Sequence, residues 1–264
     1  MISMARKARQ TSGTGIYHVM LRGINRQVIF ESNADYSYFI RILYRMVYPM
    51  DESRHPQPSL CSIYAYCLMP NHVHLLLREK AETLSSVVKR IAAAYAWYYN
   101  KRYEHYGHLF QDRFKSEPVN DMGYFVTLLR YIHQNPVAAG LSHDVASYPW
   151  SSWGEYDICG AGKSCVCSIG QVVERFPIEE LREMVNNPLS KTIQVLDVEE
   201  GTRSRSDNEV SDFLKSFGLG KPSDLVLYAS GRRNDIISAA REYGATIRQL
   251  SRLTGISIGI IRKL

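Results

Sequence analysis

The segment from position 63 to position 77 constrains the fold of this 264-residue chain more than any other. It is apolar from Ile63 to Leu77 apart from an interruption at Met-Pro-Asn, positions 69–71. Because proline cannot continue the hydrogen bonding of a central strand, the pattern predicts two strands, or one broken strand, in the middle of a sheet. The apolar run from Leu75 to Leu77 indicates a strand that is buried on both faces.

Two histidines, His72 and His74, follow the interruption. Residues i and i+2 of a strand point to the same face, so the two imidazoles lie side by side and form a candidate pair of metal ligands. A simpler interpretation makes one of them a hydrogen-bonded core residue and leaves the other exposed. Burying both without partners would be costly, which favours a metal site or a hydrogen-bonded site.

The periodicity of apolar residues predicts further strands and helices along the chain. A first strand is predicted over residues 15–21, and helices over residues 35–47, 83–99 and 122–134. Ser32 or Asn33 is the expected N-cap of the first helix, and Asn135-Pro136 is expected to end the third, because the residue before a proline disfavours the helical region. The order of strand, helix, strands and helix predicts an α+β domain over residues 1–156.

The remainder is expected to contain a connector over residues 157–222, with a helix at 177–185, and a C-terminal all-α region over residues 223–264. That region has predicted helices at 234–243, 246–253 and 257–264, with Gly244 and Gly255 at the breaks. Short helices separated by a glycine-containing turn are typical of a helix-turn-helix DNA-binding region. The alternative is a small helical cap on the main domain.

Charge and composition limit the class of protein. The formal net charge is +6, and both ends of the chain are basic, which favours a polyanionic partner. A charged content of 22% and a hydrophobic content of 45% are ordinary for a globular protein and exclude a collagen, a coiled coil or a disordered chain. No apolar run approaches the length of a membrane helix and no signal peptide is recognisable, so we expect a cytoplasmic protein without a membrane partner. The five cysteines are irregularly spaced and are expected to be reduced, and those at 159–167 lack a fourth zinc ligand at finger spacing.

A second polar cluster is carried by the third predicted helix. Tyr131 and Asn135 are four residues apart and share a helix face, so both could reach the histidines. They could equally be a packing aromatic and a helix cap. Tyr124, seven residues before Tyr131, lies on nearly the same face and is an alternative to it. His108 and His133 are expected at the surface or behind the site residues.

Aromatic and basic residues alternate between Trp97 and Lys115. Aromatic rings stack on unpaired bases and cations hold phosphates, so this segment is a candidate for binding single-stranded nucleic acid. The same pattern is expected of a helix that buries its aromatic face. The basic candidates for DNA binding are Arg6, Lys7, Arg9, Arg22, Arg26, Arg113 and Lys115.

Five motifs in order carry a resemblance to a known family. They are Gly-x-Tyr-His-Val (15–19), Arg-Gly-x-Asn-Arg (22–26), Met-Pro-Asn-His-Val-His (69–74), Gly-His-x-Phe-Gln-x-Arg-Phe (107–114) and Tyr-Ile-x-x-Asn-Pro-Val (131–137). Over about residues 10–155 the chain resembles the REP-associated tyrosine transposases. These are single-tyrosine HUH endonucleases of the IS200-like superfamily, in which HUH denotes His, a bulky apolar residue, and His.

The resemblance implies a fold, a reaction and a set of site residues. The fold would be a ferredoxin-like antiparallel sheet with helices on it. His72, His74 and Asn135 would bind Mg²⁺ or Mn²⁺, and Tyr131, favoured over Tyr124 by its Tyr-x-x-x-Asn-Pro context, would attack single-stranded DNA to form a 5′-phosphotyrosine. The N-terminal arm would bind beside a DNA hairpin, as in a palindromic repeat. The family also places its tyrosine helix in cis or exchanges it between subunits, so a monomer and a homodimer both stay open.

The sequence therefore predicts a bacterial, nucleoid-associated, metal-dependent enzyme that nicks and rejoins single-stranded hairpin DNA, with a C-terminal region that adds affinity for duplex DNA. Two alternatives stay open at this point. One is a domesticated DNA-binding regulator without cleavage activity. The other is a metal-dependent phosphohydrolase in which water attacks and Tyr131 is structural.

Overall fold

The computed structural model describes residues 10–111, 113–158, 165–189, 195–196, 205 and 207–262. The chain divides into two compact units, each with its own core. Unit 1 consists of Met1–Ile24 and Ile29–Asp197, and unit 2 consists of Asn25–Val28 and Val198–Leu264.

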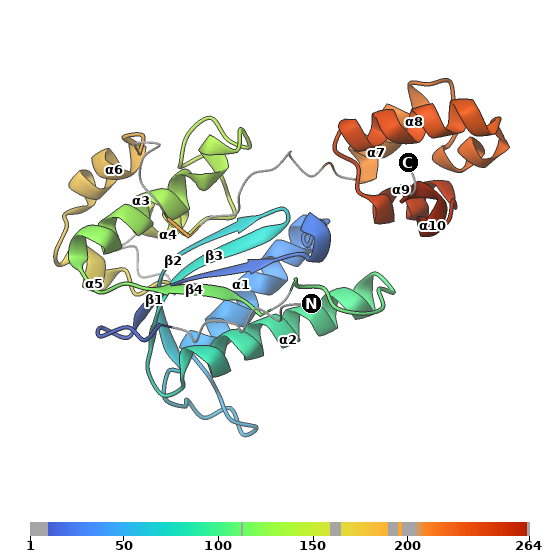
Figure 1. The fold of residues 1–264 in the computed structure, drawn as a ribbon. Helices are drawn as coiled ribbons and strands as arrows, with labels where there is room; N and C mark the ends of the chain where they lie inside the picture. The colour runs from blue at the N-terminus through green and yellow to red at the C-terminus, as the bar shows by residue number, and fades with distance from the viewer. Residues whose placement is uncertain are drawn as a thin grey trace. The chain divides into compact units, whose positions relative to one another are not determined.

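Unit 1 contains a four-stranded sheet with helices on both faces (Figure 1). Its elements are β1 (Ile16–Arg22), α1 (Asn33–Val47), β2 (Cys61–Met69), β3 (His72–Glu79), α2 (Leu84–Arg102), β4 (Lys115–Pro118), α3 (Met122–Ala138), α4 (Trp153–Asp157), α5 (Gly170–Val173) and α6 (Ile178–Asn186). A 3-10 turn, η1 (Ile24–Arg26), follows β1.

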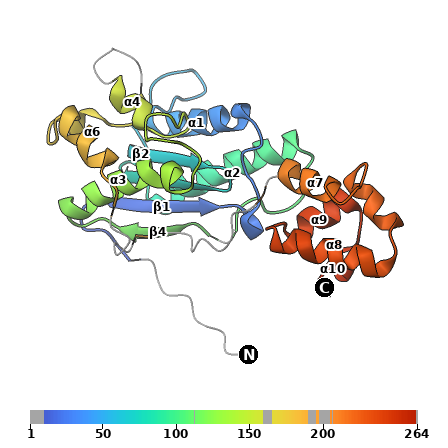
Figure 2. The same cartoon turned by 90° about the horizontal axis from the view of Figure 1, so that it is seen from above.

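The strands are ordered β2-β3-β1-β4, and each neighbouring pair is antiparallel (Figure 2). This order, formed by a βαββαβ succession, is the ferredoxin-like arrangement. Helices α1 and α2 cover one face of the sheet, and α3 covers the other (Figure 1). The predicted fold class is therefore confirmed.

The apolar segment that the sequence singled out forms two strands, β2 and β3, in keeping with the first of its two predicted forms. Every residue of β2 is buried, as are Val73 to Leu77 of β3. The turn between the strands is tied to the segment that follows β1. The carbonyl of Pro70 accepts hydrogen bonds from the N–H groups of Ile29 and Phe30, and the carbonyl of Asn71 accepts one from Gly23. These bonds fix the point at which β3, with its histidines, begins.

Helix α3 extends through Pro136, so the prediction that Asn135-Pro136 ends this helix is wrong. Proline removes a single N–H donor and fixes φ near the helical value, which is tolerable when only one turn remains. The bond from Ala139 N–H to Asn135 O, at 3.0 Å, completes that turn. Because Pro136 is buried in the packing of unit 1, tertiary contacts stabilise the continued helix.

Unit 2 is helical. Its elements are α7 (Asp207–Lys215), the 3-10 helix η2 (Pro222–Leu227), α8 (Ser230–Glu242), α9 (Ile247–Thr254) and α10 (Ile258–Ile261). Thr246 caps α9 through a capping box, and Gly255 ends it with a φ of 77°, which a residue without a side chain adopts most easily. The core of this unit includes Leu214, Ile237 and Leu250.

The segment predicted as a connector, 157–222, has structured parts in both units. Helix α6 packs against α3, whereas α7 packs against α8 and α9. Residues 159–164, 190–194, 197–204 and 206 of this segment lie outside the described part of the chain. The cysteines that the structure describes form no disulfide, and none of its described helices is long and apolar enough to span a bilayer.

Candidate active site

Strand register places a row of polar side chains on one face of the sheet. In β1, His18 lies opposite Glu117 of β4, and Met20 lies opposite His74 of β3. The same register pairs Arg22 with His72. Since directly opposed residues of antiparallel strands point to the same side, these side chains share one face. The alternate residues of β1 belong to the apolar core instead.

His74 lies at the centre of this polar row and is completely buried. Its Nδ1 is 2.9 Å from Nε2 of His18. Among the described residues, its Nε2 has no hydrogen-bond partner. Burial, together with the neighbouring rings of His72 and His18, lowers the pKa of His74 well below the usual histidine value. The ring is therefore a neutral imidazole with one nitrogen left unsatisfied.

His72 is half-buried, and its Nδ1 lies 2.7 Å from Oδ1 of Asn71. The rings of His72 and His74 meet edge to face, with centroids 4.9 Å apart. The two imidazoles therefore lie next to each other, as the spacing predicted. Each has its Nδ1 engaged by a neighbouring side chain.

Helix α3 places the Tyr131 ring in contact with His74 and His18. The Tyr131 ring stands edge-on to His74 and His18, with centroids 5.4 and 6.0 Å away. Its hydroxyl oxygen is shielded from solvent. Asn135 lies one turn further along α3 and is half-buried.

The alternative tyrosine, Tyr124, is engaged differently. Its hydroxyl donates a hydrogen bond to Oε1 of Glu117, at 2.6 Å. Burial and the Glu117 carboxylate raise the pKa of Tyr124 above the usual tyrosine value. Its phenolate is therefore harder to form than that of an ordinary tyrosine.

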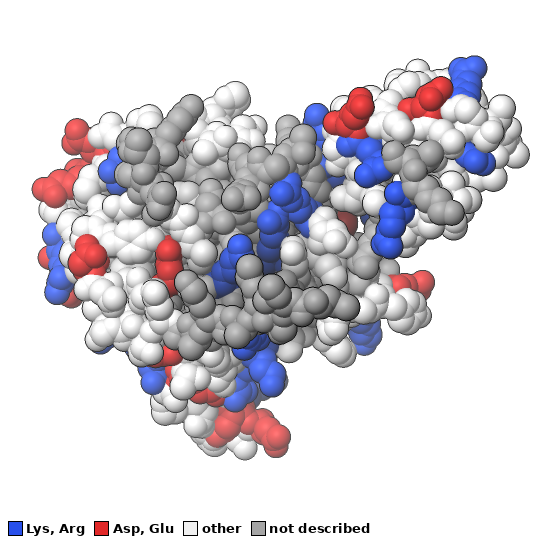
Figure 3. Space-filling model, viewed as in Figure 1, with Lys and Arg blue, Asp and Glu red and all other residues white. Residues whose placement is uncertain are grey.

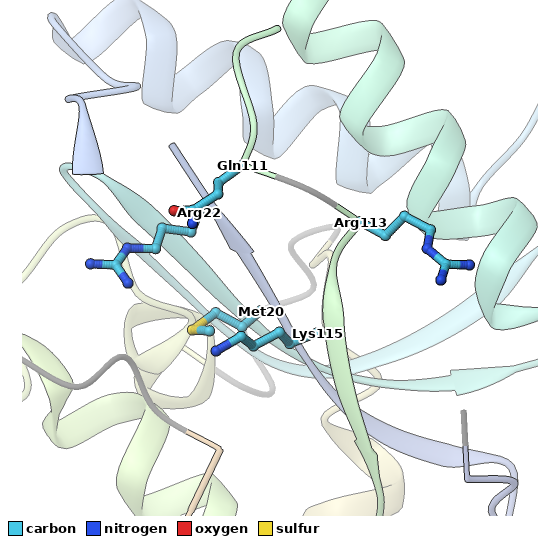
Figure 4. Close-up of a pocket in the computed structure, with 5 residues that line it drawn as sticks. All are labelled: Met20, Arg22, Gln111, Arg113 and Lys115. Atoms are coloured by element: carbon cyan, nitrogen blue, oxygen red, sulfur yellow. The ribbon is translucent and has the colours of Figure 1, made fainter. Parts of the chain in front are cut away.

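A basic pocket lies beside the polar row and is lined by residues of β1, of β4 and of the segment before β4. It has an open volume of about 360 Å³ and is lined by Met20, Arg22, Gln111, Arg113 and Lys115. Figure 4 shows Arg22 and Lys115 reaching to one side of the strands with Met20, whereas Arg113 extends to the other side. In the space-filling view, Lys and Arg side chains gather near the middle of the face seen in Figure 1 (Figure 3).

The remaining predicted DNA contacts lie elsewhere or are not described. Arg26 closes the η1 turn, with a φ of 60°. Arg6, Lys7 and Arg9 lie outside the described residues. Arg22, Arg113 and Lys115 therefore all line this pocket. Of the three, Arg22 and Lys115 reach to the same side of the strands.

Glu117 is the site residue that the sequence analysis missed. It is directly opposite His18, and its Oε1 lies 2.9 Å from Nδ1 of that histidine. The available signal was its spacing of two residues from Lys115, which places both on the same strand face. His133, expected at the surface or behind the site, is instead a core residue, bonded to the Leu129 carbonyl and to Ser152 Oγ.

The imidazoles of His72 and His74 and the carboxamide of Asn135 supply some of the ligands that a divalent cation needs. No three described His, Cys, Asp or Glu side chains are arranged to hold a metal ion by themselves. A site here would use two imidazoles and the carboxamide of Asn135, with water or phosphate oxygens at the other positions. The unsatisfied, buried Nε2 of His74 is the observation that favours such a ligand.

Part of the chain is similar to a known family. Residues 12–135 match the family model described as "Transposase IS200 like". No curated protein gives a significant match.

Two solved structures are similar in part. One is a REP-associated tyrosine transposase bound to a REP hairpin, with 17% identity, 77% of this chain and 100% of the other covered, and a TM-score of 0.48. The other is a putative transposase from Deinococcus radiodurans R1, with 21% identity, 48% of this chain and 95% of the other covered, and a TM-score of 0.32.

Proposed function

We propose that this chain is a DNA transposase of the IS200-like family, whose model residues 12–135 match, and that it nicks and rejoins single-stranded hairpin DNA through a covalent bond to Tyr131. The observation that carries the proposal is the position of the Tyr131 ring, which is in edge contact with His74 and His18 on the polar face of the sheet. The hairpin substrate follows from the motif resemblance to REP-associated tyrosine transposases.

The reaction is a transesterification. The Tyr131 oxygen attacks the phosphorus of a phosphodiester, loses its proton, and displaces the 3′ oxygen of the preceding nucleotide, which takes up a proton. The products are a 5′-phosphotyrosine and a free 3′-OH. Because the phosphate stays esterified, a 3′-OH can attack it and restore the strand without a nucleotide cofactor.

Forming the nucleophile is the costly part. A free tyrosine has a pKa of about 10, so the phenolate costs on the order of 4 kcal/mol at pH 7. His72, His74 and Asn135 would hold Mg²⁺ or Mn²⁺ beside Tyr131. A bound cation polarises the scissile phosphate and stabilises the charge that develops on it. The neutral state of His74 suits this role, because a protonated imidazole cannot be a ligand.

Basic residues around the polar face would hold the DNA backbone. Arg22 and Lys115 reach to the same side of the pocket. They supply two positive charges near β1 and β3, the strands that carry His18 and His74. Arg113, which extends to the other side of the strands, would add a contact, and Arg26 is proposed to contact the DNA as well. The same role is proposed for the N-terminal residues Arg6, Lys7 and Arg9.

For unit 2 we propose an auxiliary role as a helix-turn-helix region that binds duplex DNA. Three helices, α8, α9 and α10, follow one another with short turns at Gly244 and Gly255. Exposed basic residues, among them Arg241 and Arg262, lie on these helices or directly after them. Duplex binding by unit 2 would retain the protein near the hairpin that unit 1 cuts.

The test is incubation of the purified protein with end-labelled hairpin DNA and Mn²⁺, followed by a denaturing gel. We expect a slow-migrating protein–DNA adduct in the wild type and in Tyr124→Phe, and none in Tyr131→Phe. Free nicked product that survives Tyr131→Phe would show hydrolysis by water. Binding without any cleavage would show a DNA-binding regulator, and either result would overturn the proposal.

A further inference from the structure

Three neighbouring strands of unit 1 carry a chain of hydrogen bonds that ends at His74. Glu117 on β4 contacts His18 on β1 through Oε1 and Nδ1, at 2.9 Å. His18 in turn contacts His74 on β3 through its Nε2 and the His74 Nδ1, again at 2.9 Å. The rings of His18 and His74 are stacked, with centroids 5.1 Å apart and planes inclined by 21°. Both histidines are completely buried.

Glu117 is itself fixed from two other directions. The hydroxyl of Tyr124 and the backbone N–H of Leu196 both donate to its Oε1, at 2.6 and 3.2 Å. Burial acts to raise the pKa of Glu117, but the hydrogen bonds from His18, Tyr124 and Leu196 outweigh it and hold the pKa below the usual value. At neutral pH the side chain is therefore a carboxylate, which only accepts hydrogen bonds.

The positions of the hydrogens follow from that carboxylate. Because Glu117 only accepts, Nδ1 of His18 must donate. When Nδ1 carries the single hydrogen of the His18 ring, Nε2 has a lone pair and accepts from Nδ1–H of His74. The lone pair of the His74 ring then lies at Nε2, the buried atom that has no hydrogen-bond partner among the described residues.

The opposite tautomer of His74 would be unfavourable in the same surroundings. A hydrogen on Nε2 would be a buried donor with no acceptor in the described part of the chain. It would also remove the lone pair that a cation needs. In metal sites, a ligating histidine commonly donates its second N–H to a carboxylate or another acceptor, which fixes both the tautomer and the ring orientation.

We propose that Glu117 and His18 are positioning residues that fix His74 as the Nδ1–H tautomer and so present its Nε2 lone pair to a divalent cation. The inference rests on the metal site of the proposed function, but the tautomer itself is a property of the protein without metal or DNA. Tyr124 then has a role other than nucleophile, because its hydroxyl holds the carboxylate that begins the chain.

The first test reads the tautomers directly. Two-bond ¹H–¹⁵N correlation spectra of the metal-free, ¹⁵N-labelled protein near pH 7 distinguish a protonated ring nitrogen from one with a lone pair. Signals are assigned from the His18→Asn and His74→Asn variants. We expect hydrogens on Nδ1 of both His18 and His74. A hydrogen on Nε2 of His74 in the wild type would overturn the proposal, whatever the result of the DNA cleavage assay.

The second test measures Mn²⁺ affinity by electron paramagnetic resonance titration. Glu117→Ala removes the acceptor and is expected to weaken Mn²⁺ binding about 10-fold to 100-fold and to mix the His74 tautomers. Glu117→Gln keeps an oxygen that accepts from His18, so it should restore both the tautomer and the affinity to within a few-fold. Asp51→Ala is the matched control, because it removes an exposed acidic side chain outside the hydrogen-bond chain, and it should bind Mn²⁺ as the wild type does.

These outcomes separate a positioning role from a structural one. If Glu117→Ala unfolds the domain, circular dichroism will reveal it, and Glu117→Gln and the wild-type spectra still decide the question. Unchanged Mn²⁺ affinity in a folded Glu117→Ala protein would contradict the proposal. Loss of the covalent DNA adduct with normal tautomers and Mn²⁺ binding would contradict the proposed function alone.

Discussion

Among the histidines that the structure describes, His18, His74 and His133 are completely buried, and their surroundings give them different roles. His18 and His74 lie in one hydrogen-bonded chain beside Tyr131. His133 is satisfied at both ring nitrogens, by the Leu129 carbonyl and by Ser152 Oγ. A satisfied buried histidine stabilises the fold, whereas one with an unsatisfied nitrogen points to a ligand.

His133 makes stability depend on pH. Burial lowers the pKa of His133 from 6.5 to about 4, with the hydrogen bond to Leu129 acting in the other direction. Between these two values the unfolded chain binds a proton that the folded chain does not, so stability is lost as the pH falls from 6.5 towards 4. At roughly 1.4 kcal/mol per pH unit, the loss between pH 7 and pH 5 is about 2 kcal/mol.

Urea unfolding at pH 7 and pH 5 measures this contribution. The wild type should lose about 2 kcal/mol more than His133→Gln over that interval, because glutamine does not titrate. Other buried groups titrate alike in both proteins and cancel in the comparison. Equal losses in the two proteins would show that His133 is not the group responsible.

The sequence was sufficient to single out His72, His74 and Tyr131, because strand spacing, helix spacing and motifs are all read from residues that are close together in the sequence. It was not sufficient to find Glu117. The contact between Glu117 and His18 joins residues 99 positions apart, and only the pairing of β1 with β4 brings them together. Contacts of that kind depend on strand register, which a single sequence does not determine for a strand as short as β4.

At the scale of the elements, one buried carboxylate joins the start of α1 to the end of α2. Asp35 accepts hydrogen bonds at Oδ2 from the backbone N–H groups of Glu31 and Ser32, at 2.9 and 2.8 Å. The hydroxyls of Tyr98 and Tyr103 donate to it at 2.9 and 2.7 Å. Asp35 therefore acts both as the capping-box residue of α1 and as the contact that holds α2 beside it.

Asp35→Ala should destabilise unit 1 by about 3 kcal/mol, because it leaves two tyrosine hydroxyls and two backbone N–H groups without their acceptor. Asp121→Ala is the comparison. Asp121 is an exposed N-cap of α3 that accepts from the N–H of Tyr124 at 2.8 Å, so its loss should cost about 1 kcal/mol.

Chemical denaturation of both variants, followed by circular dichroism, tests the difference. If Asp35→Ala costs no more than Asp121→Ala, the buried network does not hold α1 and α2 together as described.

The longer elements of unit 1, β1 to β3 and α1 to α3, could be predicted from hydrophobic periodicity. The short elements β4, α4 and α5 were not predicted, and β4 has no fully buried residue. The C-terminal end of α3 also differs from the prediction. Pro136 was expected to end α3, but the helix continues for two further residues because Pro136 packs into the core and only one hydrogen bond is missing. Local preference was overridden there by tertiary packing, which no local pattern reveals.

At the scale of the whole molecule, two separate cores support two proposed activities. Unit 1 has the polar row and Tyr131, and unit 2 is a helical unit with its own apolar core. The helices of unit 2 could be predicted in part, since α8 and α9 correspond to the predicted segments, whereas α10 covers only Ile258–Ile261 of its predicted range. Residues 263–264 of that range lie outside the described chain.

If unit 2 binds duplex DNA, its basic residues should contribute to affinity by neutralising phosphates. The double substitution Arg241→Gln and Arg262→Gln should weaken duplex binding and reduce the slope of log K against log salt concentration by about 2, because each arginine neutralises one phosphate. Fluorescence anisotropy over a salt series measures this. Hairpin nicking by unit 1 should be unaffected.

The matched control is Arg182→Gln, which removes an arginine of α6 that is paired with Asp157 in unit 1. It should leave the duplex salt slope unchanged. A slope that falls equally in the control would mean that total charge, and not unit 2, sets duplex affinity.

Covalent attachment of DNA to Tyr131 is tested most directly by locating the attachment site. The protein is incubated with hairpin DNA and Mn²⁺, the DNA is digested with nuclease, and tryptic peptides are sequenced by mass spectrometry. We predict a nucleotide joined through its 5′ phosphate to Tyr131, and an unmodified Tyr124. A nucleotide on Tyr124, or cleaved DNA with no nucleotide on any tyrosine, would contradict catalysis through Tyr131.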